Sequence, residues 1–237
     1  MPHTQLSQFR NIFPGETFYI VGRGPSLWNW SRDKGIFWNA PTIFMNSAIH
    51  FLGPYKPEEY AKYPENIFRI IMDVKGIDHY LNAQYYKNLQ DHRMPNCHTF
   101  VSFHMIDAIT WEMKKKINAI DFTCYYIARD GIIPLNFLRP SYLWGPTLFS
   151  AISLAAHMGA KEIHLVAIDY GCNGPLTHWD MKAGEGSVNT DTINRWGESM
   201  QDNIIRKVEP ILKRSGITLR QFAGPHKEIC LGEKGYE

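Results

Sequence analysis

Seven short apolar runs, separated by stretches with helical spacing, constrain the fold of this 237-residue chain more than any other feature. The runs are rich in β-branched and aromatic residues, and several are almost continuously apolar, as expected of strands covered on both faces. They occupy residues 17–22, 42–46, 66–73, 98–103, 122–128, 162–169 and 218–222. Because strands alternate with helical stretches, the sequence predicts an α/β fold with a mostly parallel sheet and helices on both faces.

The helical stretches indicate how the strands are connected. They occupy residues 79–90, 102–116, 146–159 and 189–216. The clearest unit spans residues 145–171, where Pro146 lies near the first turn of a helix and Gly159 just past its end. A strand follows almost at once, which is half of a βαβ crossover.

Two Gly- and Pro-rich segments, 128–146 and 170–189, are expected to be loops beside strand or helix ends. Long irregular loops in a compact domain are usually functional or disordered. No repeat or linker divides the chain, so we expect a single domain over residues 1–237.

Composition and charge exclude several classes of partner. The chain has 25 basic and 23 acidic residues, a formal net charge of +2, and no basic run, so no nucleic-acid partner is expected. No segment approaches the roughly 18 apolar residues of a transmembrane helix, and no signal peptide is recognisable, so we predict a cytoplasmic protein. The four cysteines form no C-x-x-C pair, which argues against zinc and dithiol sites. The oligomeric state is left open.

The segment IVGRGPSL, residues 20–27, is predicted to follow the first strand as an anion-binding loop. Its glycines lack a Cβ, so backbone amides there can approach a phosphate closely, and Ser26 adds a hydroxyl beside a helix start. Leu27 stands where a dinucleotide fingerprint needs a third glycine, and no P-loop Gly-Lys-Ser/Thr is present. A simple tight turn is the alternative. The candidate binding residues are Gly22, Arg23, Gly24, Pro25 and Ser26.

Asn46 ends the second predicted strand, about twenty residues beyond the glycines. In a doubly wound sheet the carboxyl ends of neighbouring strands line one crevice, so Asn46 is expected to face the same ligand and bond a ribose or base. The alternative is a turn or cap residue.

Together, IVGRGPSL, the strand-two Asn and GPTLFSAISLAAHMGAKEIHLVAID resemble a superfamily of nucleotide-dependent transferases, over roughly a third of the chain. It includes bacterial lipooligosaccharide-type sialyltransferases, motility-associated-factor glycosyltransferases and archaeal 6-hydroxymethylpterin diphosphokinases. The resemblance implies a Rossmann-like fold whose glycine loop and strand-two Asn hold a nucleotide, CMP in the sialyltransferases. It also implies a nucleotide contact for Thr147, which could instead cap or pack its helix.

Three residues are candidates for chemistry. Asp169 lies at a strand's carboxyl end, the usual place for a functional carboxylate in an open α/β sheet. His178 follows in a Gly-rich loop, where an imidazole with an unperturbed pKa of about 6.5 can act as a general base. Arg139, with Arg23, could stabilise a leaving phosphate. The sialyltransferases have loop tyrosines where this chain has Gly171 and Thr177, so the sugar is left open.

The sequence therefore predicts a glycosyltransferase-like enzyme that moves a sugar from a nucleotide-activated donor to a glycan or small alcohol acceptor. A CMP-sugar is favoured by the resemblance. The alternative is a metal-dependent diphosphotransferase of the pterin type, with Asp73 and Asp169 holding Mg²⁺. The Asp-Leu-Asp-Gly and His-Ala-His-Gly elements of those enzymes are absent here. A non-catalytic nucleotide-binding module is the third hypothesis.

Overall fold

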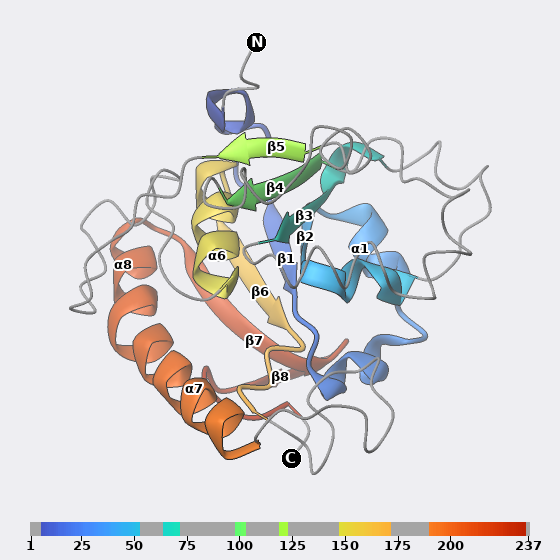
Figure 1. The fold of residues 1–237 in the computed structure, drawn as a ribbon. Helices are drawn as coiled ribbons and strands as arrows, with labels where there is room; N and C mark the ends of the chain where they lie inside the picture. Colours follow the sequence, from blue (N-terminus) through green and yellow to red (C-terminus); the bar gives the residue numbers. More distant parts are fainter. Residues whose placement is uncertain are drawn as a thin grey trace.

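A computed structural model of the chain describes residues 6–52, 64–71, 98–102, 119–122, 147–171 and 190–235. Its strands form one eight-stranded sheet in the order β5-β4-β3-β2-β1-β6-β7-β8 (Figure 1). They are β1 (Thr17–Val21), β2 (Thr42–Met45), β3 (Ile67–Ile71), β4 (His98–Ser102), β5 (Ala119–Phe122), β6 (Glu162–Val166), β7 (Thr218–Gly224) and β8 (Lys227–Ile229). Neighbouring strands are parallel except β7 and β8, which are antiparallel. The predicted mostly parallel, Rossmann-like α/β sheet is confirmed.

Helices cover both faces of the sheet, as predicted (Figure 1). On one face Ile20 and Ile43 pack with the helices that follow residue 146; on the other, Val21 and Phe44 pack with the helices between residues 25 and 52. Adjacent strand residues thus point to opposite cores. The α-helices are α1 (Gly35–Asn39), α6 (Thr147–His157), α7 (Thr190–Asn203) and α8 (Glu209–Arg214). The other helices are 3₁₀ helices η1 (Leu6–Phe9), η2 (Pro25–Trp30), η3 (Asn46–Leu52) and η4 (Pro64–Asn66) and the π-helix η6 (Ile204–Val208).

Two predicted helix boundaries are confirmed in detail. Gly159 has φ +104° after α6, and the amides of Gly159 and Ala160 donate to the carbonyls of Ala156 and Ala155. This is a Schellman end, which favours glycine. The predicted helix 189–216 is α7, η6 and α8 in succession; Pro210, which has no N–H to donate, follows the wider π turn.

Other predicted boundaries shift or lie outside the described residues. Strand β5 begins at Ala119, before the predicted start at residue 122, because pairing with β4, Thr99 opposite Ala119, overrides the low strand propensity of Ala and Asp. Residues 123–128 of the predicted strand 122–128 lie outside the described residues. The short, charged strand β8 has no apolar pattern and was not predicted. The predicted helix 79–90 lies outside the described residues. The same holds for the predicted helix 102–116, apart from Ser102, which is the last residue of β4.

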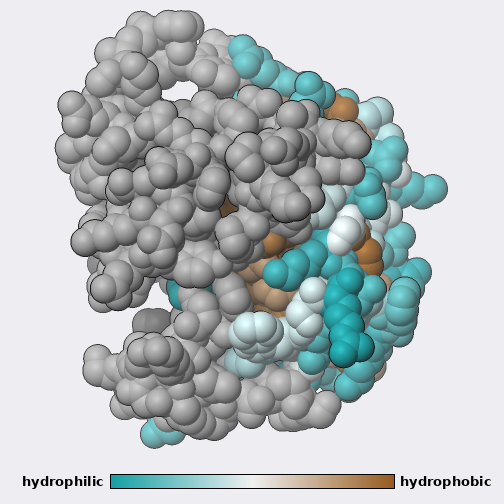
Figure 2. All heavy atoms as spheres, turned by 90° about the vertical axis from the view of Figure 1, so that its right-hand side faces the viewer, coloured by the Kyte–Doolittle hydropathy of each residue, from teal (hydrophilic) through white to brown (hydrophobic). Residues whose placement is uncertain are grey.

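The described surface is mainly hydrophilic. On the face shown in Figure 2, the apolar residues that are visible form small separate patches among polar ones. Over the described ranges, the large apolar side chains that are exposed are Ile12, Trp28 and Ile205. None of the helices described is both long and apolar enough to cross a membrane.

Candidate functional site

The glycine loop, residues 22–26, follows β1 and is hydrogen-bonded to the residues at the end of β6. The Gly22 amide donates to the Val166 carbonyl at 2.8 Å, and the Gly24 amide to the Ala167 carbonyl at 3.0 Å. The Ser26 amide, at the first turn of η2, donates to Asp169 Oδ2 at 2.7 Å. Three alternate amides of the predicted anion loop therefore have acceptors within the protein.

The two glycines are required for space rather than for an unusual backbone conformation. A Cβ on Gly22 would overlap the Ala167 carbonyl oxygen, and a Cβ on Gly24 would lie 2.7 Å from that oxygen and overlap the Asp169 carboxylate. Neither glycine has a positive φ. The close approach seen in the structure is to the end of β6, and the predicted approach of these amides to a phosphate stays a prediction. Arg23 and Gly24 remain half-buried, with part of their surface open to solvent.

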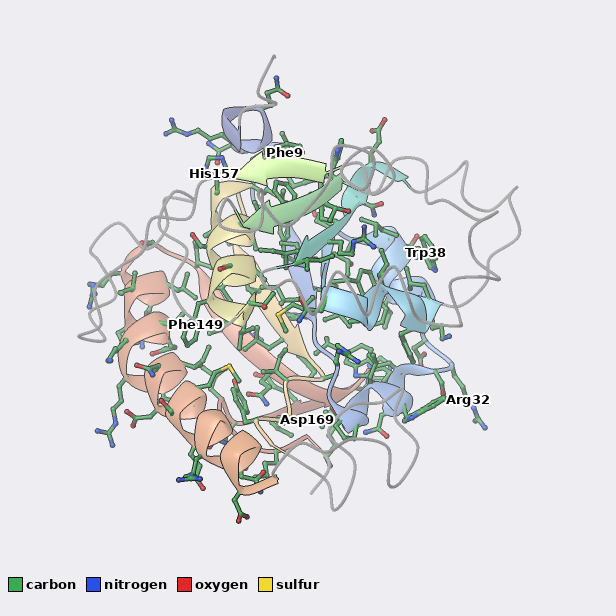
Figure 3. All side chains as sticks on the ribbon, viewed as in Figure 1. Phe9, Arg32, Trp38, Phe149, His157 and Asp169 are labelled. Carbon is green, nitrogen blue, oxygen red and sulfur yellow. The ribbon has the colours of Figure 1, made fainter. Side chains whose placement is uncertain are left out.

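Asp169 lies at the carboxyl end of β6, as predicted, beside the first turn of η2 (Figure 3). The residue is only 4% exposed. Its Oδ1 accepts a hydrogen bond from the Ser26 hydroxyl at 2.5 Å, and the Gly235 amide also donates to the carboxylate. Burial raises the pKa of Asp169 above its ordinary value, although the bonds from Ser26 and Gly235 oppose that rise. Asp169 thus anchors the glycine loop, and its predicted role in chemistry stays a prediction.

The raised pKa of Asp169 predicts how stability depends on pH. A carboxyl group that binds its proton more tightly in the folded state stabilises the fold at low pH, and this stabilisation is lost as pH rises through the folded pKa. We expect the free energy of unfolding of wild type, relative to Asp169→Asn, to fall as pH rises from about 3.9. Urea titrations of both proteins from acid to neutral pH measure the difference. A difference that grows with pH would show a lowered pKa instead.

Residues with strained backbone conformations are found at the carboxyl edge of the sheet, after β2 and β6. Four non-glycine residues among those described have positive φ, and three of them follow β2 or β6: Asn46 at 52°, Ala167 at 54° and Tyr170 at 49°. A left-handed conformation costs an ordinary residue about 1–2 kcal/mol, while Asn tolerates it better. Strained residues concentrate at functional sites, so this edge is the first place to seek one.

Asn46 also has an unsatisfied acceptor. Its Oδ1 is buried and receives no hydrogen bond from any residue in the described part of the chain. A buried polar atom without a partner costs about 1–3 kcal/mol, so such an atom calls for an explanation. Asn46 therefore follows β2, as predicted, and carries an acceptor without a donor among the described residues; that it faces a ligand stays a prediction.

Helix α6 brings two hydroxyls toward this edge. The helix packs on β1, β2 and β3 and leads directly into β6, so its first turn lies at the carboxyl edge of the sheet. Thr147 is its first residue and is half-buried. Ser150, one turn later, is fully buried, and its Oγ has no hydrogen-bond partner within the described ranges. Free amides and hydroxyls at a helix N-terminus favour anions.

Several predicted residues cannot be placed in this arrangement. His178, Arg139 and Asp73 lie outside the described residues. Those that are described contain no group of three or more His, Cys, Asp or Glu that could hold a metal ion. The structure therefore brings together the glycine loop, Asn46 and Asp169, and leaves the predicted base, the second arginine and the second metal ligand as predictions.

The sequence analysis missed two residues that hold this edge together. Gln221 is buried in β7 and bonds the Ile168 carbonyl, and Gly235 reaches Asp169 from the end of the chain. The period-two alternation of a strand puts Gln221 on the same face as Leu219, which was a usable signal, because a buried amide requires partners. Gly235 gave no such signal, since its contact depends on a turn between distant segments.

No known protein-family model matches the sequence, and no curated protein sequence matches it. Among solved structures, the MAf glycosyltransferase from Magnetospirillum magneticum AMB-1 is similar at 15% identity and a TM-score of 0.42. That match covers 76% of this chain but 29% of the other protein, so this chain spans less than a third of its length. The sialyltransferase CstII from Campylobacter jejuni, solved in complex with a substrate analogue, cytidine-5'-monophosphate, is similar at 15% identity and a TM-score of 0.44. Here 90% of this chain and 82% of the other are covered.

Proposed function

We propose that this chain is a glycosyltransferase-like enzyme that binds a nucleotide-activated sugar at the carboxyl edge of β1, β2 and β6. The observation that carries the proposal is the buried Asn46 Oδ1, which lacks a donor among the described residues and lies next to the glycine loop's strand. A ribose hydroxyl or a base amino group would supply that donor. In open α/β sheets, ligands bind where the strand order reverses, here at β1 between β2 and β6.

The proposed reaction gives each predicted residue a task. His178 accepts the proton of the acceptor hydroxyl, whose oxygen forms a bond to the anomeric carbon of the sugar. The bond from that carbon to the phosphate oxygen breaks, and the nucleotide leaves with the electron pair. Arg23, Arg139 and the first turn of α6 at Thr147 stabilise the charge that develops on the phosphate. The motif resemblance favours a CMP-sugar as donor.

The geometry of Asp169 favours this assignment over a metal-dependent diphosphotransferase. Mg²⁺ would need open carboxylate oxygens at the strand ends. Both oxygens of Asp169 accept hydrogen bonds from Ser26, which makes this carboxylate an anchor for the loop. Sugar transfer through a general base requires no such metal ligand.

Product analysis tests the proposed reaction. The protein is incubated with CMP-, UDP- and GDP-sugars, each with a panel of hydroxyl acceptors, and with ATP in parallel. Free nucleotide released from one nucleotide sugar, and lost in His178→Ala, is the expected result. AMP formed from ATP would favour the diphosphotransferase. Nucleotide binding without any turnover would favour the non-catalytic module.

Replacing Asn46 tests the binding site itself. Asn46→Gly keeps the tolerance for positive φ but removes the Oδ1 acceptor that the proposal pairs with a ribose hydroxyl or a base amino group. We expect the Kd for the bound nucleotide to rise about tenfold, the effect of about one hydrogen bond. Calorimetric titration measures the Kd. An unchanged Kd in Asn46→Gly would remove Asn46 from the site.

A further inference from the structure

The last described residues of the chain, Cys230–Gly235, fold back across the carboxyl ends of β6 and β7. The Gln221 Nε2 donates to the Ile168 carbonyl at 3.1 Å and to the Glu233 carbonyl at 2.7 Å. Its Oε1 accepts the Gly232 amide at 2.9 Å. Gln221 is 1% exposed. Its buried side-chain amide therefore makes all three hydrogen bonds, one to the end of β6 and two to the C-terminal segment.

Further bonds hold the C-terminal segment in place. The Gln201 side chain, from α7, donates to the Gly232 carbonyl. The Cys230 amide donates to Glu233 Oε2 at 2.7 Å, and the Glu233 amide returns to the Cys230 carbonyl at 3.0 Å. These bonds close a turn, in which Gly232 has φ +89°. The chain is thereby directed back toward the end of β6.

The segment ends on the carboxylate that anchors the glycine loop. Gly235 is buried, and its amide donates to Asp169. A Cβ on Gly235 would lie 2.6 Å from Asp169 Oδ1 and 2.9 Å from Ser26 Oγ, so only glycine fits at this approach. The chain of contacts therefore runs from Gln221 through Gly235 and Asp169 to Ser26.

We propose that Gln221 is a positioning residue and that Cys230–Gly235 is a strap that keeps Asp169 on the glycine loop. The strap excludes water from Asp169 and fixes the carboxylate, so that the Ser26 amide and hydroxyl stay bonded and the loop keeps the shape in which it would meet a nucleotide. The part of this inference that concerns nucleotide affinity rests on the proposed function, and the part that concerns the loop does not.

Two full-length variants release the strap in different ways. Gln221→Glu has the same shape but loses both donations, and it sets a carboxylate against the Ile168 and Glu233 carbonyls. Gly235→Ala pushes the strap off Asp169 and Ser26, because its Cβ would overlap their side-chain oxygens. The matched controls are Gln8→Glu, at an exposed position of η1, and Gly35→Ala, where a Cβ meets nothing within 4 Å.

Hydrogen exchange of the Ser26 amide in the ligand-free protein is the first measurement, because its bond to Asp169 protects it. We expect Gln221→Glu and Gly235→Ala to speed this exchange about tenfold relative to amides of the buried strand β2, the effect of about one hydrogen bond. The controls should leave the ratio unchanged. If the exchange rate of the Ser26 amide rose in both variants only as much as the rates of the β2 amides, the strap would contribute only to overall stability. That result would overturn the proposal.

Titration with CMP is the second measurement. We expect both strap variants to raise the Kd, while both controls bind as wild type does. Faster Ser26 exchange with an unchanged Kd would overturn the link between the strap and the site. If wild type did not bind CMP, UMP, GMP or AMP, the proposed function would fail, and the exchange data would still decide whether the strap holds the loop.

Discussion

Asp169→Ala is expected to lower the free energy of unfolding by about 3 kcal/mol, because it leaves several buried donors without an acceptor. The Ser26 amide and hydroxyl and the Gly235 amide all point at this carboxylate, and Asp169 is almost fully buried. Water cannot readily replace the lost acceptor there, since the glycine loop and the end of the chain close over the residue. Urea denaturation measures the loss.

Asp169→Asn separates anchoring from chemistry. The amide oxygen can still accept from the Ser26 amide, and the Ser26 hydroxyl can rotate to accept from the new NH₂ group, so we expect about half the loss of stability. If the carboxylate only anchors the loop, Asp169→Asn keeps substantial transferase activity. A folded Asp169→Asn protein without turnover would instead give the carboxylate the catalytic role predicted from sequence. A stable Asp169→Ala protein would contradict the anchoring account.

Gly197→Ala is the second variant with a large expected effect. Gly197 lies in α7, and a Cβ there would overlap the backbone carbonyl of Tyr170, a residue already held at positive φ. Backbone atoms cannot rotate away as a side-chain end can, so α7 or the segment after β6 must shift. We expect a loss of about 3 kcal/mol, at the upper end for overpacking. Thermal unfolding by circular dichroism measures it.

Gly35→Ala provides the control for this effect. Gly35 is also helical, but a Cβ there meets nothing within 4 Å, so alanine should stabilise the protein slightly, by about 0.5–1 kcal/mol. Gly24→Ala should resemble Gly197→Ala, because its Cβ would lie 2.7 Å from the Ala167 carbonyl oxygen. Equal free energies of unfolding for Gly197→Ala and Gly35→Ala would mean that α7 does not pack against the Tyr170 backbone as closely as described.

The sheet could be predicted because the composition of each of its main strands is visible in the local sequence. Runs such as 17–22 and 162–169 are nearly continuous apolar segments, and parallel strands buried on both faces require that composition. Gly159 marked the end of α6 because a left-handed residue is needed there. The early start of the fifth strand, at Ala119, could not be predicted, because pairing with a neighbouring strand decides such residues as much as propensity does.

The positions of the candidate site residues in the fold were predictable, but the contacts among them were not. Gly22, Ser26, Asn46 and Asp169 follow strand ends, and parallel topology brings such residues to one edge. The sequence could not reveal that the loop amides would bond β6, because the partner is 143 residues away from Ser26. Nor could it show the strap, which depends on Gln221 meeting a turn formed by the end of the chain.

An NMR titration of the ¹⁵N-labelled full-length chain with CMP, UMP, GMP and AMP tests the central claim most directly. We expect one nucleotide to shift backbone amides at the ends of β1, β2 and β6, with the Asn46 side-chain amide among the largest changes, while amides of η1 and α8 stay in place. Saturable shifts at this edge that Asn46→Gly weakens would support the account. Absence of shifts with all four nucleotides, or shifts confined to another part of the sheet, would contradict it.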